Sequence, residues 1–178
     1  GNSLPQMSSP TQRGMLIYRR MLCNDVPPAP PEIPSIDVEV ADNLTTREKW
    51  IQAHTGDPAC QACHENFDPL GFALENFDDL GRFRDTEKSK LIDATGVIPG
   101  DFEMTIDGYE QLAHGIAEDE RLTSCVSGFM NHWVFAGAKG KTCLAEGPRD
   151  QLASGELSFL EYFAAIAGED NFVQRIAE

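Results

Sequence analysis

Two cysteines and a histidine stand close together in this chain, in the sequence Cys60-Gln-Ala-Cys63-His64. Residues three apart lie on the same side of a helix, so both thiols can reach one flat ligand. Two thiols at this spacing can form thioether bonds with the two vinyl groups of a porphyrin, and the adjacent imidazole can then bind the iron. The motif therefore predicts one covalently attached haem c, with His64 as its proximal ligand.

Zinc sites and thiol redox centres also use pairs of cysteines at this spacing. A structural zinc site needs four ligands, and Cys23, Cys125 and Cys143 do not form a second close pair. A thioredoxin-like centre follows a buried strand, whereas residues 31–50 contain no compact β-branched run. We expect haem in preference to either alternative.

Helix signals precede the motif and define the elements that must position it. Thr45 with Glu48 three residues later has the pattern of a capping box, which predicts a helix to about His54. Asp57 followed by Pro58 predicts the start of the helix that carries the motif. Further helices are expected at 11–23, 107–117, 120–135, 157–167 and 171–176, with a hairpin within 91–108.

These elements predict a mainly α fold. We expect a small helical domain of the c-type cytochrome kind, a short β-hairpin and a C-terminal helical subdomain. The corresponding boundaries are a linker at 1–10, a haem-binding domain at 11–88 and a C-terminal helical domain at 89–178 that packs on it. A chain of 178 residues is long enough to bury a core of this size.

Large apolar side chains follow the motif and are expected to wall the haem, because a macrocycle needs surroundings of low dielectric constant. They are Phe67, Leu70, Phe72 and Phe77. Ordinary core packing is the alternative role for these four residues. Arg82 and Arg84 are expected to pair either with the haem propionates or with the nearby acids Asp78, Asp79 and Asp85.

The sixth ligand of the iron has several candidates. His54 is favoured because it lies on the apolar face that Trp50 and Ile51 define on its predicted helix. Met104 and Met130 are the alternatives, although methionines near apolar segments commonly fill gaps in a core. A hydrogen bond to a propionate or to the backbone is the other role for His54. His114 and His132 read as solvated or packed side chains.

The composition restricts the partners. A formal net charge of −15 disfavours binding to nucleic acid or to an anionic membrane surface, and it is consistent with a basic redox partner or simply with solubility. No stretch approaches the roughly 20 apolar residues of a spanning helix. The first residues do not resemble a signal peptide, yet haem attachment in bacteria follows export. We therefore expect a targeting segment before this chain in its native protein, and a periplasmic or otherwise exported location.

Three cysteines lie outside the motif, which fits an oxidising compartment. We expect one disulfide between two of Cys23, Cys125 and Cys143. Cys125 with Cys143 is slightly preferred, because these two cysteines flank the end of the predicted helix at 120–135 and the residues from Phe135 to Cys143 could run back along it in extended form.

Longer motifs carry a resemblance to a known family. They include Thr45-Thr46-Arg47-Glu48, His54-Thr-Gly-Asp57-Pro58, the cysteine motif, Asp68-Pro69-Leu70-Gly71-Phe72 and Gly81-Arg82-Phe83-Arg84. Together residues 8–86 resemble the planctomycete-type cytochrome C domain. The remainder resembles the small helical domain that follows it in large exported proteins, with Trp133-Val-Phe-Ala-Gly137 departing from the pattern of that domain. The resemblance implies haem binding and a place within a larger protein.

Two functions remain for such a haem. The first is electron transfer by a haem with two axial ligands. The second is an enzyme, or a sensor of gas or peroxide, with an open sixth position. We favour electron transfer, because no motif provides the acid–base group of a peroxidase.

Overall fold

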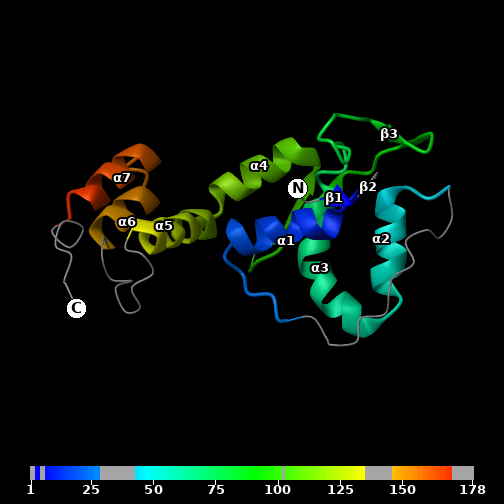
Figure 1. Ribbon diagram of the computed structural model, residues 1–178, viewed down its shortest axis with the longest axis horizontal. Coiled ribbons are helices and arrows are strands. Elements are labelled where there is room, and N and C mark those ends of the chain that lie inside the picture. The colour runs from blue at the N-terminus through cyan, green and yellow to red at the C-terminus, as the bar shows by residue number, and fades with distance from the viewer. Residues whose placement is uncertain (1–2, 5–6, 29–42, 102, 135–145, 170–178) are drawn as a thin grey trace. The chain divides into compact units, whose positions relative to one another are not determined.

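The computed structural model describes residues 3–4, 7–28, 43–101, 103–134 and 146–169. These residues form seven helices and three two-stranded antiparallel sheets, so the expected mainly α fold is confirmed (Figure 1). They divide into two compact units, residues 1–118 and 119–178. The hairpin and the helix after it belong to the first unit, which differs from the boundary expected at residue 88. The expected helix at 171–176 lies outside the described residues.

The first unit contains three helices in its N-terminal part, and the third of them carries the cysteine motif (Figure 1). They are α1 (Pro10–Arg20), α2 (Thr46–Thr55) and α3 (Pro58–Phe72). The caps of α2 and α3 agree with the sequence. Thr45 and Glu48 form the expected capping box, and the Asp57 carboxylate accepts the backbone N–H of Ala59 with Pro58 at the first helical position.

Helices α1 and α3 meet backbone to backbone. A Cβ atom added at Gly14 would lie 1.8 Å from the carbonyl oxygen of Phe67, and one added at Gly71 would lie 1.9 Å from that of Pro10. Glycine is therefore required at both positions, because any side chain would force the helices apart. The contact holds the C-terminal half of α3 against α1.

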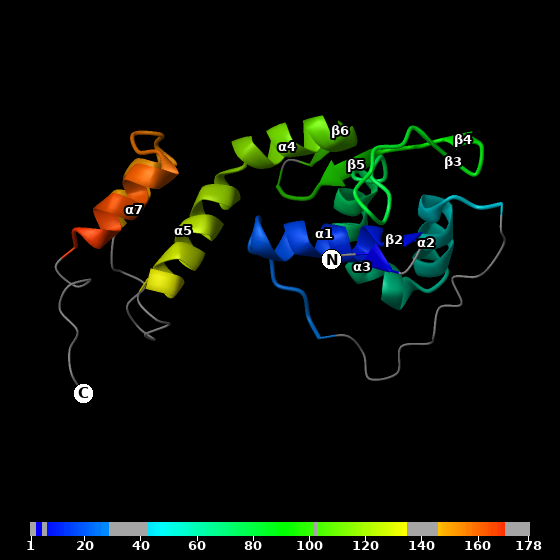
Figure 2. The same cartoon turned by 45° about the horizontal axis from the view of Figure 1, so that its top comes forward.

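Three β-hairpins complete the first unit. Strands β1 (Ser3–Leu4) and β2 (Met7–Ser8) pair near the N-terminus, and β3 (Thr86–Glu87) pairs with β4 (Lys90–Leu91). Strands β5 (Thr95–Ile98) and β6 (Met104–Asp107) form the hairpin that the sequence predicts, and α4 (Gly108–Glu118) follows at once (Figure 2). Only the third hairpin was expected.

Residues 7–10 are not a linker, which corrects the expectation for this segment. Ser8 and Ser9 are buried, and the Ser8 hydroxyl donates a hydrogen bond of 2.8 Å to the Glu75 carboxylate. The Ser9 hydroxyl accepts the backbone N–H of Gln12 and caps α1. The two serines that suggested a solvated linker therefore have hydrogen-bond partners within the fold: Ser8 bonds to a distant carboxylate and Ser9 caps a helix.

The second unit has its own small core. Helices α5 (Glu120–Val134), α6 (Glu146–Ala153) and α7 (Phe159–Ala167) enclose a cluster of buried side chains. The cluster consists of Met130, Leu152, Tyr162 and Ile166. Helix α6 was not expected from the sequence. None of the helices in the described parts of the chain is long and apolar enough to cross a membrane.

Glu75 joins separate parts of the first unit through a buried carboxylate. Besides the Ser8 hydroxyl, it contacts Arg84 at 3.1 Å and Arg13 at 3.6 Å, and its side chain is almost completely buried. Burial raises the pKa of Glu75 to about 7, which outweighs the opposing effects of the Ser8 hydrogen bond and the two guanidinium groups. The folded state therefore favours the protonated carboxyl.

This pKa predicts a pH-dependent stability. The raised folded-state value means that Glu75 contributes stability that is full below about pH 4.5 and is lost as the pH rises through about 7. Glu75→Gln cannot ionise, so it should not lose this stability as the pH rises. Between pH 4.5 and pH 8 the free energy of unfolding of the wild type should fall by about 3 kcal/mol relative to that of Glu75→Gln. Urea unfolding at both pH values measures the change. The exposed Glu65→Gln is the control, and equal pH dependence in all three proteins would contradict the prediction.

Candidate haem-attachment site

The cysteine motif occupies the first half of α3. Cys60 and Cys63 are free thiols, both partly exposed, and they stand one turn apart on the same helix as His64. Helix α3 follows α2 rather than a strand, which disagrees with a thioredoxin-like centre. The helix presents two accessible thiols and an imidazole on neighbouring positions of one surface.

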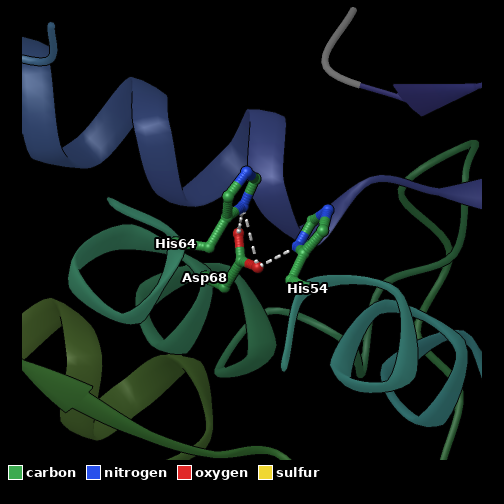
Figure 3. Close-up of side chains that lie close together, drawn as sticks. All are labelled: His54, His64 and Asp68. Carbon is green, nitrogen blue, oxygen red and sulfur yellow. Dashed lines mark hydrogen bonds and ion pairs between the residues drawn. The ribbon is translucent and has the colours of Figure 1, made fainter. Parts of the chain in front are cut away.

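A single carboxylate holds two histidines beside the motif, as Figure 3 shows. Asp68 lies one turn beyond His64, and both of its oxygens are 3.2 Å from Nδ1 of that histidine. Nδ1 of His54, from the end of α2, lies 2.6 Å from the same carboxylate. His54 and Asp68 are buried, whereas His64 is partly exposed.

The charge of Asp68 determines the tautomers of both rings. Burial tends to raise the pKa of Asp68, but hydrogen bonds from His54 and His64 outweigh burial and lower it below its ordinary value. An ionised carboxylate only accepts hydrogen bonds, so each Nδ1 must carry a proton and donate it. A neutral ring then keeps its lone pair on Nε2. Nε2 of His64 has no hydrogen-bond partner among the described residues, so it is available to a metal.

The cluster of His54, His64 and Asp68 also offers three ligand atoms within 4.8 Å of one another. Neither Cys60 nor Cys63 belongs to a group of this kind among the residues that the structure describes. A zinc site built on the two thiols therefore finds no further ligands in the described part of the chain.

A pocket of about 150 Å³ lies beside the histidines. Its lining includes Ile51, His54, Gln61, His64, Glu65 and Phe72. The volume is well below the roughly 300 Å³ of the smallest pockets that enclose a drug-sized ligand, so a haem would extend beyond it. Cys60, Cys63 and His64 would hold a haem at this edge of α3, where the two thiols would form its thioether bonds and the imidazole would bind its iron.

Of the four residues expected to wall the haem, Phe72 alone lines the pocket. Phe67 is buried beneath His64, with ring centroids 4.9 Å apart. Leu70 is fully buried, and Phe77 packs against Phe83 and Tyr109 at centroid distances of 5.9 and 5.1 Å. These side chains therefore support α3 and the loop after it as core residues, which is the alternative role that the sequence left open.

The two candidate propionate ligands have protein partners instead. Nε of Arg82 lies 2.7 Å from Asp78, one of the expected acids. Arg84 forms ion pairs with Glu75 and Glu87, which were not among the expected partners. Arg82 is largely exposed, so its ion pair leaves it accessible to solvent.

The candidates for the sixth ligand lie in different surroundings. His54 is adjacent to His64, with ring centroids 3.6 Å apart. Met104 is exposed on β6, where its sulfur lies close to Gly115. Met130 belongs to the core of the second unit, and His114 and His132 are exposed.

In this structure His54 does not lie where a second axial ligand of the iron would have to lie. Imidazoles on opposite faces of one iron would have ring centroids roughly 6 Å apart, because each metal–nitrogen bond is about 2 Å long. The observed 3.6 Å separation, with both rings on one carboxylate, is shorter. Ligation by His54 therefore requires that its hydrogen bond to Asp68 break when haem is attached.

Cys23 and Cys125 are both disulfide-bonded, whereas the two thiols of the motif are free. The expected bridge among the three remaining cysteines is confirmed. The preference for Cys125 with Cys143 is wrong, because Cys23 is one of the bridged residues. Cys143 lies outside the described residues. Cys60 and Cys63 take no part in the disulfide, so both are free thiols, which is the state that thioether formation needs.

Asp68 was missed as a site residue by sequence reasoning, which used it only within a family motif. The available signal was its position four residues after His64, where the two side chains face each other on a helix. Trp50 was assigned to the apolar face of α2, and it does contact His54, with ring centroids 5.0 Å apart.

A family model supports the expected resemblance in part, for the first part of the chain and not for the small domain that follows it. A family model described as PSCyt3, protein of unknown function (DUF1588), matches residues 1–87. This is a planctomycete family of domains associated with cytochrome c. The match covers the whole cysteine motif and the Asp68 motif, and it begins before residue 8, where the resemblance was expected to start. No curated protein matches this chain, and no solved structure matches it.

Proposed function

We propose that this chain carries one haem c, bound through Cys60 and Cys63 with His64 as an axial ligand, and that it acts as an electron-transfer module of the c-type cytochrome kind. The supporting observation is that α3 carries two free thiols and an imidazole at neighbouring positions. Its two thiols are free and one turn apart, and the adjacent imidazole has an Nε2 without a partner among the described residues. Haem supplies a one-electron change in the oxidation state of its iron.

The chain supplies a fixed platform for that group. Close packing at Gly14 and Gly71 anchors α3 on α1, so the motif does not depend on a loop for its position. Asp68 orients the ring of His64, and Phe72 covers one side of the adjacent pocket. A site that changes little between oxidation states favours rapid electron transfer.

The proposed partner is a basic redox protein, because the chain has a net charge of −15 and opposite charges steer association. The proposed location is the periplasm or another exported compartment. Haem attachment after export supports this location, and so do the disulfide-bonded Cys23 and Cys125. The chain would serve as one part of a larger protein.

A haem with an open sixth position is the second candidate, which would make the chain part of an enzyme or a sensor of gas or peroxide. The arrangement of His54 favours it, because this histidine shares Asp68 with His64 instead of facing it across a metal. The two candidates therefore differ in whether His54 leaves Asp68 to bind the iron.

Absorption spectra of the ferric and ferrous protein, with and without carbon monoxide, separate the two candidates. Electron transfer with His54 as the ligand predicts a low-spin haem that carbon monoxide does not alter. His54→Ala should then become high-spin and bind carbon monoxide, whereas His114→Ala, at an exposed position on α4, should not change the spectrum. A wild-type protein that binds carbon monoxide at once would contradict electron transfer. An unaltered low-spin spectrum in His54→Ala would direct the search to Met104 and Met130.

A further inference from the structure

The carboxylate of Asp68 is an unusual acceptor because it is buried, charged and shared. Its side chain is 6% exposed, and it receives hydrogen bonds from two imidazoles. In such surroundings a negative charge acts strongly on nearby groups, since little water screens it. His64 is one of those groups, and it is also the proposed axial ligand.

Histidines that bind metals commonly donate their second N–H to a backbone carbonyl, a water or a carboxylate. A carboxylate is the strongest of these acceptors, because the hydrogen bond is assisted by charge. It shifts the Nδ1 proton towards the acceptor and makes Nε2 a stronger electron donor. A stronger donor stabilises ferric iron more than ferrous iron, because the ferric ion carries the greater positive charge.

We propose that Asp68 is a positioning residue for the axial ligand: it holds His64 in the Nδ1–H tautomer and lowers the reduction potential of the haem. The inference rests on the proposed haem attachment. Asp68 lies outside the cysteine motif, so the motif alone would not set the reduction potential of the haem. Before haem is attached, the 2.6 Å hydrogen bond between His54 and Asp68 also holds the carboxylate in place beside His64.

Asp68→Asn tests the inference, because asparagine keeps the shape of the side chain and removes its charge. Asp85→Asn is the matched control, since it is the same substitution at an exposed aspartate that does not line the pocket. The measurement on the haem-loaded proteins is the midpoint potential, which does not require carbon monoxide to bind the iron. We expect a more positive potential in Asp68→Asn and no such shift in Asp85→Asn.

An unchanged potential in Asp68→Asn would overturn the inference, and so would an equal shift in Asp85→Asn, which would assign the effect to net charge. If Asp68→Asn fails to fold, the wild-type chain without haem still gives a test. Nitrogen-15 NMR of His64 should show a protonated Nδ1 and an unprotonated Nε2, and the opposite tautomer would overturn the inference. A wild-type protein that never acquires haem would refute the proposed function and would leave this tautomer result standing.

Discussion

Replacement of Cys60 and Cys63 by alanine should abolish covalent haem attachment. Each thiol is free and partly exposed on α3, so each is available to form one of the two thioether bonds. The double variant has no thiol left on this helix and should release all of its haem on denaturation. Either single variant should keep one bond and attach less haem than the wild type.

Haem staining of denaturing gels, together with the intact mass, measures the attachment. Gln61→Ala is the matched control, because Gln61 is an exposed residue between the two cysteines and its replacement leaves their spacing unchanged. It should attach haem normally. A double cysteine variant that retains haem through denaturation would show that the bonds lie elsewhere in the chain.

The second large effect concerns stability rather than chemistry. Gly71→Ala should lower the free energy of unfolding by about 3 kcal/mol or more, because the new Cβ would stand 1.9 Å from the carbonyl oxygen of Pro10. The obstructing atom belongs to the backbone, so no rotation of a side chain relieves the overlap. Gly14→Ala should cost a similar amount, since its Cβ would meet the carbonyl oxygen of Phe67.

Gly128→Ala provides the control for these glycines. Gly128 lies within α5, is exposed, and has no atom within 4 Å of an added Cβ. Alanine should therefore leave the stability unchanged or raise it by up to about 1 kcal/mol through its better helix propensity. Urea unfolding of all three variants makes the comparison. Equal stability of Gly71→Ala and Gly128→Ala would show that α1 and α3 do not meet as closely as described.

The sequence predicted those elements whose signals are local. The start of α2 at Thr45 and Glu48 and the start of α3 at Asp57 and Pro58 depend on residues within one turn of each helix. The hairpin of β5 and β6 was also predicted, because its alternating strands are separated by Pro99 and Gly100. Local signals of this kind need no knowledge of the rest of the fold.

Features that depend on distant partners were missed. Ser8 read as part of a linker because its partner, Glu75, lies 67 residues away. The need for glycine at positions 14 and 71 follows only from the crossing of two helices. The hairpin of β3 and β4 was missed for a different reason, because Lys88 and Ser89 take the positive φ values that usually indicate glycine or asparagine.

The candidate site shows the same division. The thiols and His64 were predicted from a contiguous motif, and the structure places all three on one helix. The relation of His54 to His64 was not predictable, because it depends on how α2 and α3 meet. The shared carboxylate of Asp68 replaces the expected arrangement, in which the two histidines face each other across a metal, with one in which they lie side by side.

The mass of the purified wild-type protein, after expression with a haem-attachment system and denaturation in acid, tests the central claim most directly. The account predicts the mass of the chain plus one haem, with no haem released into an organic solvent. Proteolysis should place the added mass on the peptide that contains Cys60 and Cys63. A bare chain with extractable haem, or with none, would contradict it.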